Sequence, residues 1–211
     1  MSDGRTVLVL APHTDDGELG CGGTIAKEVE RGSEVIYVAF SSADRSLPEG
    51  YPKGTLKKEL TCATKVLGVR KDHVVCYDYD VRNFHVKRQD ILDEMLRLRE
   101  EYGPTVVFAP SLNDLHQDHK IVAEEARRMF KRTSILGYEM PWNNISFDTL
   151  SFSVLEKRHV DQKVEALKCY ESQRHRAYLN SDFINSLALA RGVQVSVPYA
   201  EAFEVVRWIM P

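Results

Sequence analysis

Four apolar segments alternate with amphipathic segments through the first two-thirds of this chain. The apolar segments are nearly continuous, as is typical of strands buried on both faces, and cover residues 7–11, 34–40, 73–77 and 105–109. The amphipathic segments have apolar positions at helical spacing and cover residues 22–31, 56–67, 88–102 and about 120–131. This order predicts an α/β fold with a Rossmann-like open, mostly parallel sheet and helices on both faces.

The last third of the chain is less regular. Its pattern predicts strands at residues 134–138, 147–155 and 199–208, and helices at residues 160–170 and 182–191. No internal repeat, low-complexity segment or linker divides the 211 residues, which are enough to bury one substantial core. We therefore expect a single domain over residues 1–211.

Composition and charge narrow the class of protein. Hydrophobic residues make up 43% of the chain and charged residues 28%, as in ordinary soluble globular proteins. The formal net charge is −3 and the Lys and Arg residues are dispersed, which argues against a nucleic-acid partner. No apolar run approaches the roughly 20 residues of a membrane span, and no apolar signal segment precedes the first strand.

The cysteines show no close paired spacing and no CxxC motif; they are Cys21, Cys62, Cys76 and Cys169. We expect all four to be reduced and mostly buried, as is usual in the cytosol. Together with the missing signal segment, this predicts a cytoplasmic protein.

Two polar clusters follow the first and the fourth predicted strands. They are His13-Thr-Asp-Asp16 and His116-Gln-Asp-His119. In a parallel sheet both clusters open at the same edge, so imidazoles and carboxylates converge in one cleft. This set suits a divalent transition metal; zinc, for example, binds such groups at about 2.0–2.2 Å and lowers the pKa of its bound water to about 7. A spare carboxylate can take the proton of that water, and a second imidazole can stabilise an oxyanion or protonate a leaving group.

Two other interpretations of the clusters compete with a metal site. Their polar side chains could simply cap the helices that follow, but capping would have to produce two such clusters by coincidence. A strand that runs into glycines could also indicate a dinucleotide site. The glycines, however, do not have the GxGxxG spacing, and the carboxylates would repel a phosphate, so we reject a dinucleotide site.

These motifs carry a resemblance to a known family. The chain resembles the PIG-L/LmbE-like family of zinc-dependent N-acetylglucosaminyl-type deacetylases in the segment 11–25 (APHTDDGELGCGGTI) and in His116-Gln-Asp-His119. Weaker matches extend the resemblance over nearly the whole chain: Glu59, Leu67-Gly-Val69, Lys163, Ala166, the segment from Tyr170 to Gln173, and Tyr199-Ala-Glu-Ala-Phe-Glu204.

The resemblance implies a metal-dependent hydrolase that removes the N-acetyl group from a small-molecule amino-sugar conjugate. By position in the motifs, it implies that His13, Asp16 and His119 bind the metal. Zinc is the expected metal, although the sequence does not exclude another divalent first-row ion. Members of the family are often oligomeric, so a homo-oligomer is open as well.

The resemblance also implies a division of catalytic roles. Asp15 would be the general base that activates the water, and His116 would stabilise the oxyanion or act in its collapse. Asp118 would orient a neighbouring histidine. The spacing of the residues alone does not distinguish the metal-binding aspartate from the base.

The chain departs from the family pattern where substrate is bound. Many members carry an Arg shortly before the position of Glu59, whereas this chain has Lys57 and Lys58 there. An ammonium group does not replace a guanidinium in bidentate recognition. Arg82 and Asn83, in the loop after the third strand, are therefore candidates to bind the substrate; the alternative for both residues is an ordinary polar turn.

Two further functions compete with the deacetylase. A metal-dependent lyase or hydratase could use the same scaffold on a carboxylated substrate, and only the deacetylase would release acetate. A carbohydrate- or nucleotide-binding module without catalysis would need neither Asp15 nor His116, so the presence of both residues argues against it.

Overall fold

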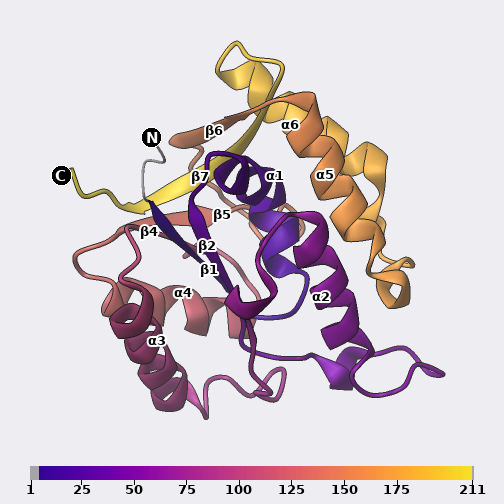
Figure 1. Cartoon of the computed structure of the whole chain (residues 1–211), viewed down its shortest axis with the longest axis vertical. Coiled ribbons are helices and arrows are strands. Elements are labelled where there is room, and N and C mark those ends of the chain that lie inside the picture. The colour runs from indigo at the N-terminus through magenta and orange to yellow at the C-terminus, as the bar shows by residue number, and fades with distance from the viewer. Residues whose placement is uncertain (1–4, 211) are drawn as a thin grey trace.

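A seven-stranded sheet forms the centre of the computed structural model, which describes residues 5–210 (Figure 1). The strands are β1 (Thr6–Ala11), β2 (Glu34–Ala39), β3 (Val74–Cys76), β4 (Val106–Pro110), β5 (Ser134–Tyr138), β6 (Ser151–Leu155) and β7 (Tyr199–Arg207). The α-helices are α1 (Asp16–Glu30), α2 (Thr55–Val66), α3 (Arg88–Tyr102), α4 (Gln117–Met129), α5 (Lys157–Lys168) and α6 (Ser181–Gln194).

The strand order is β3-β2-β1-β4-β5-β7-β6. The first five strands pair in parallel, and β7 pairs antiparallel with both β5 and β6. The predicted α/β fold with a mostly parallel sheet is therefore confirmed. The antiparallel strands at one end, β6 and β7, come from the irregular last third of the chain and are separated in sequence by α5 and α6.

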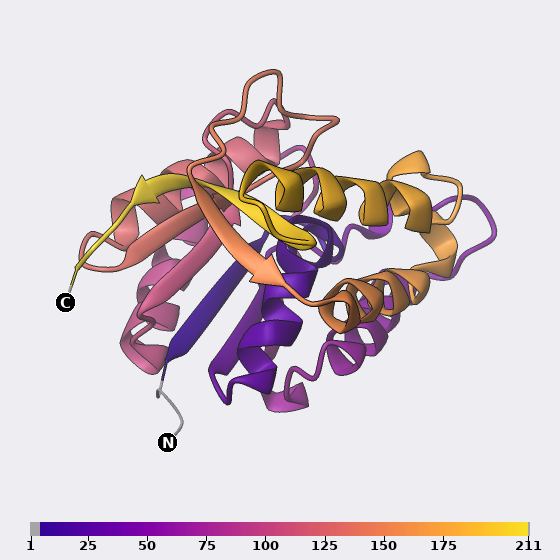
Figure 2. The same cartoon turned by 90° about the horizontal axis from the view of Figure 1, so that it is seen from above.

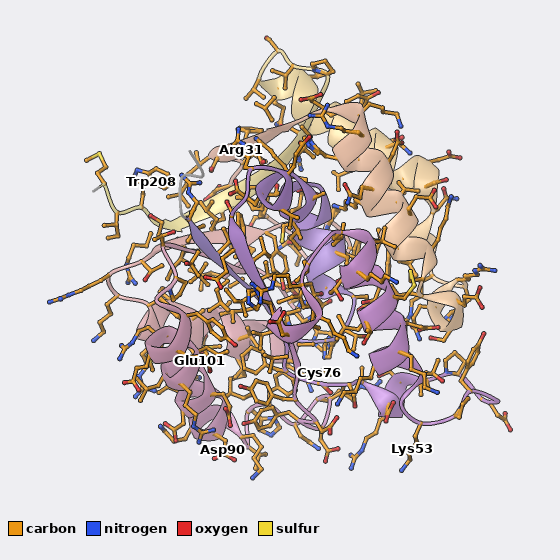
Figure 3. The ribbon with its side chains drawn as sticks, in the orientation of Figure 1. Arg31, Lys53, Cys76, Asp90, Glu101 and Trp208 are labelled. Atoms are coloured by element: carbon orange, nitrogen blue, oxygen red, sulfur yellow. A yellow bond between two sulfur atoms is a disulfide. The ribbon has the colours of Figure 1, made fainter. Side chains whose placement is uncertain are left out.

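Helices cover both faces of the sheet, as predicted (Figure 2). Alternate residues of β1 point to opposite layers: Val7 and Val9 pack with α1, α2 and α5, whereas Leu8 and Leu10 pack with α3 and α4. Both layers are fully apolar at β1, which explains why this strand reads as a continuous apolar run. On the outer side of α3 the charged residues Asp90 and Glu101 are exposed (Figure 3).

The direction of strand addition reverses beside β1. The chain adds β2 and β3 on one side of β1 and β4 and β5 on the other. The loops after β1 and β4 consequently meet at the carboxyl edge of the sheet, at the position where ligands bind in open α/β sheets. Within residues 5–210, no helix combines the length and hydropathy that a bilayer crossing needs.

Helix α1 begins at Asp16, ahead of the predicted start at Gly22. The glycines concealed this first part of the helix, because glycine is a poor helix former. They are required by close packing: a Cβ at Gly17 would lie 2.5 Å from the Tyr37 ring, and one at Gly20 would overlap the Tyr138 ring. The helix is interrupted at Cys21, whose φ of −146° is not helical.

Two buried residues from distant elements satisfy the backbone groups at this interruption. The Glu201 carboxylate accepts hydrogen bonds from the Gly23 N–H (3.0 Å) and the Thr24 N–H (2.7 Å). The Lys163 ammonium donates to the Leu19 carbonyl (2.8 Å) and pairs with Glu201 (2.7 Å). Both partners are at most 7% exposed, so this ion pair forms part of the interior.

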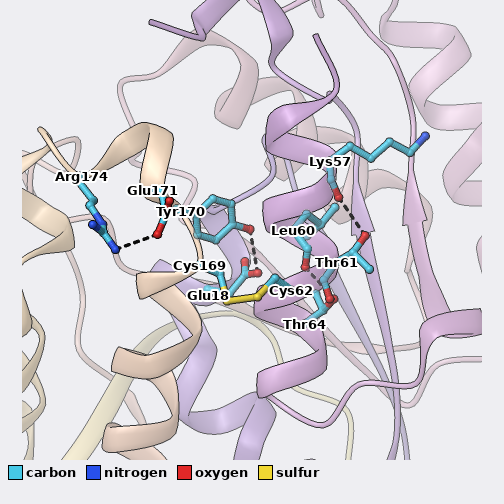
Figure 4. The surroundings of a disulfide bond; sticks show 10 residues. All are labelled: Glu18, Lys57, Leu60, Thr61, Cys62, Thr64, Cys169, Tyr170, Glu171 and Arg174. Carbon is cyan, nitrogen blue, oxygen red and sulfur yellow. Dashed lines mark hydrogen bonds and ion pairs between the residues drawn. A yellow bond between two sulfur atoms is a disulfide. The ribbon is translucent and has the colours of Figure 1, made fainter. Parts of the chain in front are cut away.

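Cys62 in α2 and Cys169 after α5 are joined by a disulfide, with their Cα atoms 5.9 Å apart (Figure 4). The expectation that all four cysteines are reduced is therefore wrong for this pair, and it no longer supports a cytoplasmic location. The bonded cysteines are 107 positions apart, and only the packing of α2 beside α5 brings them together. No spacing rule predicts such a pair.

We expect denatured, unreduced protein to titrate with two thiol equivalents, from Cys21 and Cys76, and fully reduced protein with four. Because the bond closes a long loop, we expect Cys62→Ser to lower the free energy of unfolding by about 3–5 kcal/mol. Denaturant titration measures the loss, and Cys76→Ser is the control that leaves the bond intact. Four reactive thiols without reductant would contradict the assignment.

Candidate metal centre and active site

The two polar clusters come together at the carboxyl edge of the sheet. His13 follows β1, and Asp16 is the first residue of α1. His116 immediately precedes α4, and His119 lies in its first turn. The register of β1 against β4, in which Val9 is opposite Phe108, brings the two loops side by side.

Three side-chain atoms form a compact triangle at the centre of the site. Asp16 Oδ2 lies 3.1 Å from His13 Nδ1 and 3.2 Å from His119 Nε2, and the two nitrogens are 3.4 Å apart. Tetrahedral zinc, with bonds of about 2.0–2.1 Å, separates its ligand atoms by about 3.3–3.4 Å. The donor set and its spacing therefore fit a divalent first-row metal.

Each imidazole of the triangle turns its other nitrogen toward a carboxylate. His13 Nε2 is 3.1 Å from Asp118 Oδ2, and His119 Nδ1 is 2.7 Å from Asp114 Oδ2. Metal-binding histidines in proteins are held in this way. The sequence reasoning singled out Asp118 but missed Asp114. Asp114 could have been found in the sequence, because it is a second carboxylate in the same loop after β4.

The carboxylates govern the charge of the cluster. Burial lowers the pKa of His13, but Asp16 and Asp118 outweigh burial and raise the pKa to about 9. Burial also lowers the pKa of His119, whereas Asp16 and Asp114 raise it to about 10. Burial raises the pKa of Asp16, and the two imidazoles hold it well below its usual range. The centre of the cluster therefore favours positive charge.

Asp15 occupies the N-cap position of α1 but makes no capping hydrogen bond. Its side chain lines the cavity over the cluster instead. Burial, together with the charge of Asp16, raises the pKa of Asp15 to about 6. The capping interpretation therefore does not hold for this residue.

His116 does cap a helix, and this part of the capping interpretation is correct. Its Nδ1 accepts a hydrogen bond from the Asp118 N–H (3.2 Å) at the start of α4. A neutral imidazole whose Nδ1 accepts must carry its hydrogen on Nε2. Burial and the neighbouring histidines lower the pKa of His116 to about 4. His116 also lies within 4.8 Å of His13 and His119, measured between possible ligand atoms.

A buried polar group fixes the loop that carries Asp15. The Thr14 carbonyl accepts hydrogen bonds from Tyr37 (3.0 Å) and Tyr170 (2.6 Å), and both phenols also contact the Glu18 carboxyl group. Burial raises the pKa of Glu18 to about 8. Tyr37 of β2 and Tyr170 of the segment after α5 thus fix the backbone of the first polar cluster, residues 13–16.

The cluster forms the floor of a cavity of about 240 Å³. Arg82 lines this cavity, whereas Asn83, Lys57 and Lys58 are not among its lining residues. Several polar or aromatic lining residues were not predicted as site residues from the sequence, among them Trp142, Asn143, Arg176 and Tyr178. They come from the last third of the chain, where the pattern of apolar positions carried little information.

Comparison with known proteins identifies a family and relatives that match most of the chain. Residues 8–130 match the PIG-L family model, which is described as GlcNAc-PI de-N-acetylase. The uncharacterized deacetylase YaiS of Escherichia coli K12 is 25% identical over 175 residues, which are 80% of this chain and 91% of the relative. The probable N-acetyl-alpha-D-glucosaminyl L-malate deacetylase 2 of Bacillus anthracis is 25% identical over 190 residues, with 82% and 83% covered.

Solved structures share the fold over nearly the full length. The N,N'-diacetylchitobiose deacetylase of Pyrococcus horikoshii has a TM-score of 0.79 at 23% identity, covering 96% of this chain and 84% of that one. The 4-carboxy-2-hydroxymuconate hydratase GalB of Pseudomonas putida KT2440 has a TM-score of 0.78 at 20% identity, covering 98% of both chains. At these identities the likeness establishes the fold and not the reaction.

Proposed function

This chain belongs to the PIG-L family, and on that premise we propose that it is a metal-dependent hydrolase that removes the N-acetyl group from an amino-sugar conjugate. Relatives named as deacetylases support the reaction, and the Bacillus anthracis relative, named for an N-acetylglucosaminyl substrate, supports the substrate class. The proposed metal is zinc, which suits two imidazoles and a carboxylate.

One observation carries the proposal: each of two imidazoles has one nitrogen at the centre of the cluster and the other on a carboxylate. A merely structural pair of histidines would not require two separate carboxylates behind it. We assign His13, Asp16 and His119 as the ligands. When bound, the metal supplies a Lewis acid that polarises the acetyl carbonyl and lowers the pKa of a water molecule.

Asp15 is the general base in this proposal. Its carboxylate lines the cavity, is adjacent to a ligand in the sequence, and makes no capping bond that would occupy it. It takes a proton from the attacking water as the water oxygen bonds to the acetyl carbon. It then gives that proton to the leaving nitrogen when the carbon–nitrogen bond breaks. The products are a free amine and acetate.

His116 stabilises the carbonyl oxygen as it gains negative charge. Because Nδ1 accepts from the Asp118 N–H, the Nε2–H is the donor available to that oxygen. Asp118 and Asp114 act through His13 and His119, whose ring orientation they fix. The residues of the site therefore provide a base, an oxyanion donor and oriented ligands.

We expect purified protein to release equimolar acetate and amine from at least one N-acetylglucosamine derivative. The screen comprises N,N'-diacetylchitobiose, the methyl glycoside of N-acetylglucosamine and N-acetylglucosamine 1-phosphate. Acetate is measured by proton NMR and the amine by its reaction with fluorescamine. Activity should disappear after chelation and dialysis and return with one equivalent of zinc. The proposal would be contradicted if the purified protein bound no zinc and, with zinc added, released no acetate from any conjugate.

The same screen separates the competing functions. A lyase or hydratase would change a carboxylated substrate without releasing acetate, and the shared fold with GalB makes this the relevant control reaction. A binding module would retain ligand affinity and show no turnover.

A further inference from the structure

Two arginines line the cavity over the metal centre without a carboxylate partner. They are Arg82, in the loop after β3, and Arg176, in the segment between α5 and α6. Among residues 5–210, no carboxylate oxygen lies within 4.0 Å of either guanidinium, whereas nearby Arg45 and Arg174 pair with Asp80 and Glu171. A guanidinium that lines a cavity without a carboxylate partner keeps N–H donors available to a ligand.

Arg82 is held in a conformation that its own side chain does not favour. Its φ is +67°, in the left-handed region that non-glycine residues rarely adopt. Two backbone hydrogen bonds fix it there: its N–H donates to Asp118 Oδ2 (2.6 Å), and its carbonyl accepts from Gln117 Nε2 (2.9 Å). Asp118 also contacts His13, so the position of Arg82 is tied directly to the metal centre. Strain of this kind occurs where function uses the geometry.

Arg176 is positioned by a chain of hydrogen bonds from α2. Glu59 accepts from the N–H and the hydroxyl of Ser172 (2.9 and 2.7 Å), whose hydroxyl accepts from Gln173. Gln173 Oε1 in turn accepts from Arg176 Nε (3.2 Å). This bond uses the Nε edge of the guanidinium and leaves the two terminal nitrogens without a protein partner among the hydrogen bonds of the described residues.

An aromatic pair lies beside Arg176 in the cavity wall. The rings of Trp142 and Tyr178 stack with centroids 4.2 Å apart, and the Arg176 Cζ lies 5.9 Å from the Tyr178 centroid. Trp142 lines the cavity and is 38% exposed, so part of the indole is accessible. Aromatic faces of this kind pack well against the apolar faces of a sugar ring.

We propose that the group attached to the amino sugar is an anion, a carboxylate or a phosphate, and that Arg82 and Arg176 bind it while the sugar packs on Trp142. The inference rests on the proposed deacetylase function and adds the chemical class of the conjugate. Arginine is suited to such groups because its planar fork matches the oxygens of carboxylate and phosphate. The pocket-lining carboxylates, Asp15 and Asp16, belong to the metal centre, so the arginines give the rest of the cavity a positive charge.

The test compares three probes that differ only at the anomeric substituent. They are the methyl glycoside of N-acetylglucosamine, its carboxymethyl glycoside and N-acetylglucosamine 1-phosphate. We expect kcat/KM to be at least tenfold higher for the anionic probes than for the methyl glycoside, and the preference to fall as NaCl is raised. Preference for the carboxymethyl probe or for the phosphate then distinguishes the two sources of negative charge.

Variants test the residues themselves. Arg82→Gln and Arg176→Gln should each reduce the ratio of kcat/KM for the anionic and neutral probes roughly tenfold, since a charged hydrogen bond contributes about 1.5–3 kcal/mol. Arg176→Lys keeps the positive charge but loses the planar fork of N–H donors. Its preference for the anionic probes should therefore lie between those of Arg176→Gln and the parent protein. Arg174→Gln is the matched control, because Arg174 lies in the same segment and pairs outward with Glu171.

A binding experiment keeps the inference separate from the reaction. Calorimetric titration of zinc-loaded protein with glucosamine 1-phosphate and with methyl glucosaminide measures anion recognition without turnover. Stronger binding of the phosphate, lost in Arg82→Gln and Arg176→Gln, supports the inference even where no acetate is released. Equal affinity for the two ligands, or an equal effect of Arg174→Gln, would overturn it while leaving the deacetylase proposal intact.

Discussion

Asp15→Asn is expected to abolish turnover and leave the metal in place. The amide has nearly the same shape as the carboxylate but cannot take a proton from water. General-base catalysis contributes about 10²–10⁴-fold, so we expect kcat to fall by roughly that factor. Asp15 lies outside the triangle of His13, Asp16 and His119, and metal analysis of the purified variant should therefore give the same metal-to-protein ratio as the parent.

Two variants make this result interpretable. His13→Ala removes a corner of the triangle and should lose both the metal and the turnover. Asp93→Asn changes the same kind of side chain on the exposed side of α3 and should change neither. An Asp15→Asn protein that keeps more than a tenth of the parent kcat would show that another group takes the proton.

The fold could be predicted from the sequence because its decisive signals are local. Continuous apolar runs mark strands that are buried on both faces, and β1 has apolar partners in both layers. The start of α1 could not be predicted in this way. Its glycines read as a turn, and only the aromatic rings of Tyr37 and Tyr138, which come from other strands, show why glycine is needed inside a helix.

The candidate metal centre could be located from the sequence because its residues lie in two short motifs after two strands. The topology alone brings the ends of β1 and β4 together, and the triangle follows from that placement. The division of roles between Asp15 and Asp16 came from the family resemblance, since adjacent carboxylates look the same in a sequence. In the structure both side chains line the cavity, and Asp16, but not Asp15, forms a corner of the triangle.

The wall of the cavity could not be predicted, because nothing local distinguishes its residues. Arg174 and Arg176 are two positions apart in one polar segment, yet Arg174 pairs with Glu171 at the surface and Arg176 lines the cavity. The difference depends on Glu59, which holds Ser172 from more than a hundred positions away. Contacts of this range are set by packing and leave no periodic signal.

Glutamates of β7 fix both motifs in the same long-range way. Glu204 accepts hydrogen bonds from the Ser111 hydroxyl (2.8 Å) and the Leu112 N–H (2.9 Å), and so supports the loop that leads to His116. Glu201 supports the helix that follows the first motif. Strand β7 therefore supports both polar motifs, although it contributes no residue to the triangle of His13, Asp16 and His119.

We expect Glu201→Ala to be among the most destabilising single substitutions in this protein. It removes the only carboxylate paired with the buried Lys163 ammonium within the described residues, and it deprives the Gly23 and Thr24 N–H groups of their acceptor. Breaking one side of a buried ion pair costs about 3–5 kcal/mol, because the remaining charge is left desolvated. Denaturant unfolding should show this loss as a lower midpoint with little change in slope.

Lys163→Ala and the double variant identify the cause. If the orphaned ammonium dominates, the double variant should be no less stable than Glu201→Ala, which gives a coupling energy of about 1–3 kcal/mol. Asp161→Ala provides the control, because Asp161 lies in α5 together with Lys163. Its ion pair with Lys157 is more than half exposed and should contribute less than about 1 kcal/mol. A Glu201→Ala protein as stable as Asp161→Ala would mean that the interruption of α1 is held by the packing of its glycines alone.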